Sequence, residues 1–392
     1  MLNLQKSLDH KKRILLTCRF VCLFFAVGVL MSYNLWTSDR FFPLLPLFDA
    51  MPVLKHPLDV ILLILFIVVV VLGIVRPKPV VFLLVFGILG FYLVQDQCRW
   101  QPWVYVYAMF LLPFAKKDPG KASIRLVNYF QIILIGVYVW SGLQKLNPNF
   151  IEFTFKRILT ELLNIESNSL VNDLGTLGYA IPVVEVLIGL CLVFRRSRNI
   201  GVYFALATHI FILIYLSPLG INYNSIVYPW NLAMMTLVLL AFFKNDQPLF
   251  TWRRESTGAQ IPYFLAILLT WILPVLNLFG KWDHYLSFSL YSDKPHEFYI
   301  AVQENSLGQL PGNFKPYFVS LEGMTGGRLI DVNKWSVDEL NVPFYPETRV
   351  FKKLSANFCT YGIPGDHLIF LEFEKPIHKG KFYSYQCKDL GF

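Results

Sequence analysis

The sequence predicts an all-α polytopic membrane helical bundle of about nine spans, followed by a small C-terminal α+β extracytoplasmic domain. Three observations lead to this prediction. Hydrophobic residues make up 55% of the 392 residues and charged residues only 16%, against about 25% charged in soluble domains. The apolar residues form long blocks separated by short charged clusters, and a membrane span needs about 20 apolar residues. After about residue 281 the chain is less apolar and contains alternating, strand-like segments.

The apolar blocks define nine candidate spans within a transmembrane domain of residues 1–280. They cover residues 14–36, 57–75, 79–97, 102–115, 124–146, 172–194, 199–219, 228–243 and 260–280. The fourth block is short for about 30 Å of hydrocarbon, so we expect it to be tilted, half-buried or re-entrant. Residues 151–163 combine apolar residues at helical spacing with several charges, which favours an amphipathic helix on the membrane surface.

The basic residues predict the orientation of the spans. With the N-terminus in the cytoplasm, the inner segments hold sixteen Lys and Arg residues and the outer loops hold six. Cytoplasmic loops carry an excess of basic residues, so we expect a plasma (inner) membrane protein with a cytoplasmic N-terminus. The net charge of +9 is then a topology signal and not a nucleic-acid site. The inner residues are Lys6, Lys11, Lys12, Arg13, Arg76, Lys78, Lys116, Lys117, Lys121, Arg125, Arg195, Arg196, Arg198, Lys244, Arg253 and Arg254, and the outer ones are Arg40, Lys55, Arg99, Lys145, Lys156 and Arg157.

Residues 281–392 predict a small α+β domain that lies outside and can bind a partner protein. LIFLEFE (368–374) and KFYSYQC (381–387) alternate like strands, and residues 345–359 predict a short helix with one apolar face. Cys359 and Cys387 fall in this domain, either as a disulfide or as two buried free thiols. The six cysteines form no CxxC pair and no His/Cys cluster, so we expect no metal site.

Polar residues inside predicted spans are costly and point to function. Glu185 lies ten residues before Arg195, and His209 lies eleven residues after Arg198. At 1.5 Å per residue, both lie about 15 Å from the inner face on consecutive antiparallel spans. We therefore expect Glu185 and His209 to form a hydrogen-bonded pair, which either handles protons or only clamps two helices together. Asn231, on the next span, lies slightly further out, at about 20 Å.

Lys145 ends the fifth predicted span, within SGLQKLNPNF (141–150). It follows Arg125 by twenty residues, which places it about 30 Å further along, at the outer face. A Lys in the last turn of a helix favours the helix dipole and can extend its stem to the interface, without any chemistry. A desolvated Lys at the mouth of an apolar cavity can instead act as a base. Depth counting predicts no direct contact between Lys145 and the level of Glu185 and His209.

Three residues of the outer half are candidates for binding a cofactor or a lipid. Tyr223 and Trp230 lie near the predicted outer ends of two spans, and Asn231 follows directly. Tyr223 and Trp230, together with Asn147, Asn149, Asn224 and Tyr228, would form a polar, aromatic mouth. The alternative is the aromatic belt that membrane proteins carry at the interface.

Two stretches, SGLQKLNPNFIEFTFKRIL and residues 178–235, resemble the membrane core of vitamin K-dependent gamma-carboxylase, which the HTTM group of bacterial membrane proteins shares. The likeness covers about residues 120–245. It consists of a Gly-x-x-Lys-Leu that ends a span, a surface helix, an acidic residue, an RxRxIG-type loop and a span with a central His. DoxX-like proteins share the acidic residue and the Gly-x-x-Lys-Leu pattern more loosely. WDHYLSFSLYS (282–292) is similar to a segment that follows the last span in HTTM-type proteins.

The resemblance implies two functions, which the sequence leaves open. In the carboxylase the Lys of this motif deprotonates a quinol, so the likeness implies a carboxylase/epoxidase-like or quinone-linked enzyme with Lys145 as the base. Glu185 and His209 would relay protons or shape the cavity, and a quinone would be the lipid-soluble ligand. The alternative is a non-enzymatic, DoxX-like membrane module that binds a lipid or a partner protein.

Overall fold

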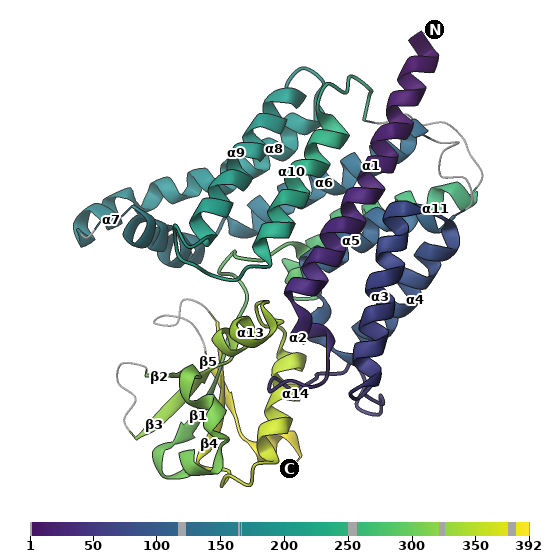
Figure 1. The fold of residues 1–392 in the computed structure, drawn as a ribbon. Helices are drawn as coiled ribbons and strands as arrows, with labels where there is room; N and C mark the ends of the chain where they lie inside the picture. Colours follow the sequence, from purple (N-terminus) through teal and green to yellow (C-terminus); the bar gives the residue numbers. More distant parts are fainter. Residues whose placement is uncertain are drawn as a thin grey trace. The chain divides into compact units, whose positions relative to one another are not determined.

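The computed structural model describes residues 2–116, 123–163, 165, 167–249, 257–320, 326–374 and 382–391. The chain is mostly helical and divides into two compact units (Figure 1). The bundle unit contains Met1–Met31, Ile61–Phe91 and Gln101–Asp293. The sheet unit contains Ser32–Val60, Tyr92–Trp100 and Lys294–Phe392. Residues 281–293, which we assigned to the tail domain, therefore belong to the bundle unit, and two segments from the first hundred residues belong to the sheet unit.

Each of the nine predicted spans contains a helix of the described chain. The helices are α1 (Leu2–Met31), α3 (Leu58–Val75), α4 (Pro79–Gln95), α5 (Pro102–Leu111), α6 (Ser123–Lys145), α7 (Asn168–Leu174), α8 (Ala180–Val193), α9 (Arg198–Leu216), α10 (Val227–Phe242), α11 (Thr257–Ile267) and α12 (Leu273–Asn277). By length and composition, five can cross a membrane: His10–Met31, Leu58–Val75, Arg125–Lys145, Ser169–Val193 and Arg198–Leu216. The other four apolar helices have 10–17 residues. The helical bundle is thus confirmed, whereas the count of nine spans is not.

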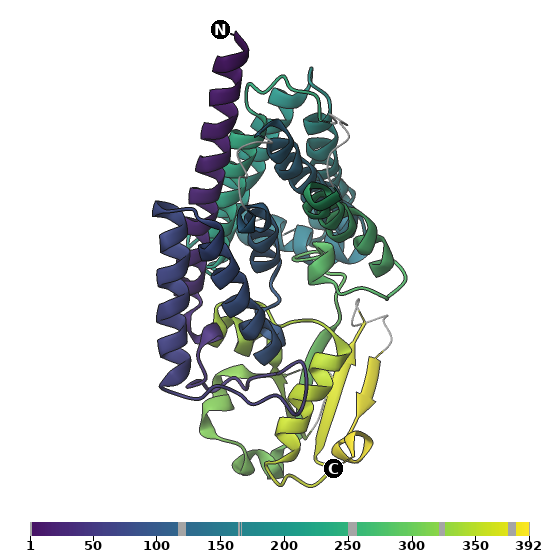
Figure 2. The same cartoon turned by 90° about the vertical axis from the view of Figure 1, so that its right-hand side faces the viewer.

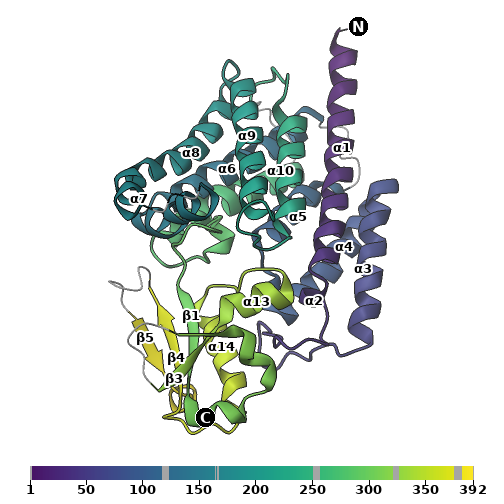
Figure 3. The same cartoon turned by 60° about the vertical axis from the view of Figure 1, so that its left-hand side comes forward.

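Helix α6 is the most enclosed of the five long helices. In its most apolar stretch 83% is buried, against 50% or less for the other four. It packs against α8, and α8, α9 and α10 lie side by side (Figures 1 and 3). The predicted amphipathic segment is helical, with π-helical turns at Phe150–Phe155 and Ile158–Leu162. Its position on a membrane surface stays a prediction.

The sheet unit is built on five antiparallel strands in the order β2-β3-β1-β4-β5. Helices α13 and α14 cover one face of the sheet (Figures 2 and 3). There the Phe298 ring of β1 stacks on the Phe351 ring of α14, with the ring centroids 4.7 Å apart. The predicted strand pair and the predicted helix are confirmed; the turn between the strands, at 375–381, lies outside the described residues. The elements are α2 (Tyr33–Trp36), β1 (Glu297–Gln303), β2 (Phe318–Val319), β3 (Gly327–Asp331), α13 (Val332–Leu340), α14 (Thr348–Cys359), β4 (Leu368–Phe373) and β5 (Phe382–Tyr385).

Two buried arginines hold the early segments inside the sheet unit. Arg40 forms an ion pair with Asp96, so residues 32–60 and 92–100 are joined by opposite charges with almost no exposure to water. The Arg99 guanidinium lies 5.8 Å from the Trp36 ring and 4.8 Å from the Tyr92 ring, within cation–π range. A buried charge is tolerated only when it is paired or hydrogen-bonded. These contacts therefore make the two loops an integral part of the unit.

Candidate functional site

Three polar side chains share one face of α6. Tyr138, Ser141 and Lys145 are separated by three and four residues, which places them on one side of a helix with 3.6 residues per turn. Tyr138 is buried, and 11% of the Lys145 side chain is exposed. Polar groups in a buried, apolar helix need partners on the neighbouring helices.

Two glycines bring α6 and α8 into close contact. A Cβ atom on Gly142 would lie 2.7 Å from the carbonyl oxygen of Pro182, and one on Gly189 would lie 2.6 Å from Cγ2 of Val139. Small residues permit such close approach between membrane helices. The two contacts also fix the register of the antiparallel pair, so that the end of α6 faces the start of α8.

Lys145 and Glu185 form an ion pair across this contact. Lys145 Nζ lies 2.9 Å from Oε1 and 2.7 Å from Oε2 of Glu185, and it donates to Ser141 Oγ at 2.7 Å. Only 7% of the Glu185 side chain is exposed. An ammonium group has three N–H donors, and here a carboxylate and a hydroxyl supply their acceptors.

The ion pair corrects the predicted separation between Lys145 and Glu185. Side chains on a helix point back toward its N-terminus, so the Lys145 stem runs back to the level of Ser141. In addition, the start of α8 at Ala180 faces the end of α6, so Glu185, about 7.5 Å along α8, lies within reach of the Lys145 side chain.

His209 joins α6, α9 and α10 in a second hydrogen-bonded group. Its Nε2 lies 2.7 Å from the Tyr138 hydroxyl, and its Nδ1 lies 2.7 Å from Asn231 Oδ1. Asn231 Nδ2 donates to the Val227 carbonyl, so Oδ1 accepts from Nδ1–H, and Nε2 accepts from Tyr138. The predicted Glu185–His209 hydrogen bond is therefore wrong, because both ring nitrogens of His209 have other partners.

The three candidate cofactor-binding residues do not converge. Asn231 belongs to the His209 group. The Trp230 ring packs against Tyr107 of α5 at 5.8 Å, and the Tyr223 ring packs against Tyr291 at 5.9 Å. Consecutive helical residues point about 100° apart, which separates Trp230 from Asn231. Their role in binding a cofactor stays a prediction.

Sequence reasoning missed the polar residues that hold the segment WDHYLSFSLYS against the end of α6. Gln144 is buried and donates to Asn277 Oδ1 at 3.1 Å, and Asn277 in turn donates to the Trp282 carbonyl at 2.7 Å. Asn147 donates to the Ser292 carbonyl at 2.9 Å. The signal available was the run of polar residues on both sides of Lys145, of which the sequence interpretation uses Lys145, Asn147 and Asn149 but not Gln144. Ser141 and Tyr138 were detectable by their helical spacing from Lys145.

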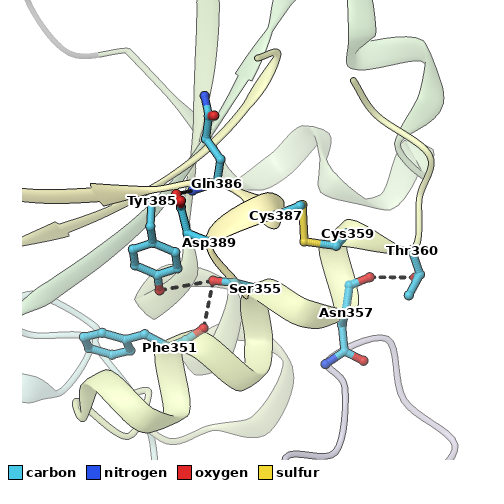
Figure 4. Close-up of a disulfide and its surroundings, with 9 residues drawn as sticks. All are labelled: Phe351, Ser355, Asn357, Cys359, Thr360, Tyr385, Gln386, Cys387 and Asp389. Carbon is cyan, nitrogen blue, oxygen red and sulfur yellow. Dashed lines mark hydrogen bonds between the residues drawn. A yellow bond between two sulfur atoms is a disulfide. The ribbon is translucent and has the colours of Figure 1, made fainter. Parts of the chain in front are cut away.

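Two features of the sheet unit concern its chemistry. Cys359, the last residue of α14, forms a disulfide with Cys387, with the Cα atoms 5.7 Å apart (Figure 4). The disulfide is thus confirmed over the alternative of two free thiols.

His296 Nδ1 lies 2.7 Å from Oε1 of the buried Glu372, and this hydrogen bond raises the pKa of His296. Within the described residues, no group of three or more His, Cys, Asp or Glu side chains could hold a metal ion.

Comparison with known proteins adds one finding. A family model described as methylamine utilisation protein MauE matches residues 123–225. No curated protein and no solved structure matches the chain. The resemblance to vitamin K-dependent gamma-carboxylase, to the HTTM group and to DoxX-like proteins is therefore wrong, and the expectation of a quinone ligand loses its basis. The stretch that contains Lys145, Glu185 and His209, less than half of the chain, is similar to a family of membrane proteins, MauE.

Proposed function

We propose that the protein is a non-enzymatic multi-pass membrane module, which anchors the disulfide-bonded sheet unit and presents it to a partner protein outside the cytoplasm. The observation that supports this most is the engagement of Lys145 by Glu185 and Ser141. A catalytic base needs a free lone pair that faces its substrate. Lys145 instead acts as a donor that ties the end of α6 to the start of α8.

An extracytoplasmic position for the sheet unit is supported by its disulfide and by its charges. Disulfides persist in oxidising compartments outside the cytoplasm. The segments 32–60 and 92–100 contain only Arg40, Lys55 and Arg99 as basic residues, and two of these are buried in structural contacts. Segments with few exposed basic residues, here Lys55, are typical of the outer side.

The partner surface that we favour is the β5 edge of the sheet. In the described sheet β5 pairs only with β4, and Phe382 and Tyr383 are 62% and 52% exposed. An open strand edge offers backbone donors and acceptors to an extended peptide, and exposed aromatic side chains add specificity. We therefore propose an extended segment of a partner protein as the ligand of this edge.

Two experiments test the proposal in native membranes. First, a membrane-impermeant maleimide, applied to intact cells after a reductant, should label Cys359 and Cys387; labelling only in inside-out vesicles would refute the sidedness. Second, a photo-crosslinking amino acid at Tyr383 should give a discrete adduct, and the same group at the exposed Lys352 of α14 should not. The Tyr383 adduct should persist in the double variant K145M/E185L. Its selective loss there would support a chemical role for the ion pair.

A second candidate function, proton transfer within the bundle, is favoured by one specific observation. Tyr138, His209 and Asn231 form an unbroken hydrogen-bonded chain across three helices. Chains of this kind can relay protons in membrane proteins. Proton uptake by the protein in liposomes that falls in His209→Phe, at unchanged stability, would favour this function over the anchoring module.

A further inference from the structure

We propose that the bundle unit binds an anionic phospholipid at three exposed basic residues, Arg195, Arg196 and Lys244, which we call the basic rim. This site is separate from the Lys145–Glu185 pair and from the partner surface, and the inference does not depend on either. It rests on how the rim is held, on its net charge and on the apolar surface beside it.

Hydrogen bonds between two segments hold the backbone that carries the basic rim. Its residues come from the α8–α9 turn and from the segment that follows α10. The Lys244 backbone N–H donates to Asn199 Oδ1 at 3.1 Å. The buried Arg198 guanidinium donates to the Leu192 carbonyl at 3.1 Å and to the Asn245 carbonyl at 2.6 Å, which ties the two segments together. The rim is therefore placed before any ligand arrives, which lowers the entropic cost of binding.

The charge of the rim suits a single phosphodiester. Arg198 is buried and its donors are taken by carbonyl groups, so it does not contribute to ligand binding. The exposed Asp246 lies in the same segment as Lys244 and offsets one of the three positive charges. The remaining excess attracts one anionic headgroup, since each basic residue near a membrane surface strengthens anionic-lipid binding about fivefold.

An apolar surface adjoins the rim on α8 and α9. Phe194, Tyr203 and Phe204 are 64%, 60% and 53% exposed, and the Tyr203 ring contacts the ring of Phe243 at 6.1 Å. Phe194 directly precedes the rim arginines, and Phe243 directly precedes Lys244. A free phosphate ion would use only the rim. A ligand with a phosphate group and acyl chains would cover both the basic rim and the apolar surface. We therefore propose a phospholipid as the ligand.

The test is native mass spectrometry of the full-length protein with added phosphatidylglycerol or phosphatidylcholine. We expect the wild type to bind phosphatidylglycerol in preference to phosphatidylcholine. R195Q/R196Q should weaken phosphatidylglycerol binding about 25-fold, at about fivefold for each basic residue, and R195K/R196K should restore most of it. The matched control is R76Q/K78Q, which removes two exposed basic residues that also adjoin exposed apolar side chains. It should bind as the wild type does.

Three results would overturn the proposal. One is an equal affinity of the wild type for the two lipids. Another is an equal loss in R76Q/K78Q, which would show a diffuse charge effect instead of a site. The third is displacement of the lipid by inorganic phosphate, which would assign the rim to a soluble anion. The first and third use only the wild type, so they decide the matter even if R195Q/R196Q does not fold.

Discussion

Removing one partner of the Lys145–Glu185 pair should destabilise the bundle, and removing both should restore most of the loss. The two side chains are 11% and 7% exposed, so either one left alone would be a nearly buried, unpaired charge. Breaking a buried ion pair typically costs about 3–5 kcal/mol, whereas apolar replacement of both partners is near neutral or stabilising. Because a little water reaches both groups, we expect about 3 kcal/mol for K145M and for E185L. The double variant K145M/E185L should lie within about 1 kcal/mol of the wild type.

The assay is equilibrium unfolding of the purified protein in mixed micelles, followed by tryptophan fluorescence. The four proteins form a double-mutant cycle, which isolates the interaction between the two residues from their separate effects. If the losses of the two single variants were additive and the double variant were the least stable, Lys145 and Glu185 would not stabilise the bundle as an ion pair. The reasoning about burial would fail if each single variant were as stable as the wild type.

Three further predictions follow from contacts described above. Replacing Cys359 and Cys387 by Ser should lower the stability of the sheet unit by about 3.5 kcal/mol, from the 28-residue separation of the two cysteines, as measured by urea unfolding. Gly142→Leu should prevent α6 and α8 from packing, because a Cβ already meets the α8 backbone at 2.7 Å, so folded protein should be lost in mixed micelles; Leu143→Ala is the control. The raised pKa of His296, caused mainly by its hydrogen bond to Glu372, should stabilise the sheet unit at low pH. This stabilisation is complete below the unfolded value of about 6.5 and is lost as the pH rises through the raised value.

Each of these predictions has an outcome that contradicts it. An unchanged urea midpoint in the serine variant would show that the disulfide does not constrain the unfolded chain. Normal folding of Gly142→Leu would mean that α6 and α8 can move apart without loss. For His296, the comparison is His296→Gln, which should remove the loss of stability as the pH rises above about 6.5. An identical pH profile would exclude the Glu372 hydrogen bond as its cause.

Local sequence patterns were sufficient to locate the apolar helices, α14 and the strands β4 and β5, but not β1, β2, β3 or α13. Each apolar block contains a helix, and α14 buries Val350, Leu354 and Phe358 on one face as the spacing predicts. These elements depend on short-range periodicity. Which segments join the sheet unit depends instead on contacts such as the ion pair between Arg40 and Asp96, which are far apart in the chain. No local pattern reports such pairings.

The contacts of Lys145, Glu185 and His209 could be predicted only in part, for a related reason. The residues were identified by their polarity within apolar spans, but their partners were assigned from depth along straight helices. Partner choice depends on helix register, which Gly142 and Gly189 set, and on the direction of long side chains, which brings Lys145 back to the level of Glu185. Neither quantity follows from counting residues from the nearest charged loop.

The set of chain segments that form the sheet unit also constrains the number of membrane crossings. Its segments 32–60, 92–100 and 294–392 belong to one compact body, and we predict that they lie on one side of a membrane that the five candidate spans cross. Crossing by α3 alone would place the first two segments on opposite sides, so the shorter α4 must cross as well. Between residues 100 and 294 lie three long helices, an odd number, so one or all of the three shorter apolar helices there must also cross. Under this prediction the total number of crossings is odd, seven or nine, with the start of α1 and the sheet unit on opposite sides of the membrane. The basic residues of the inner loops and the disulfide independently favour this arrangement.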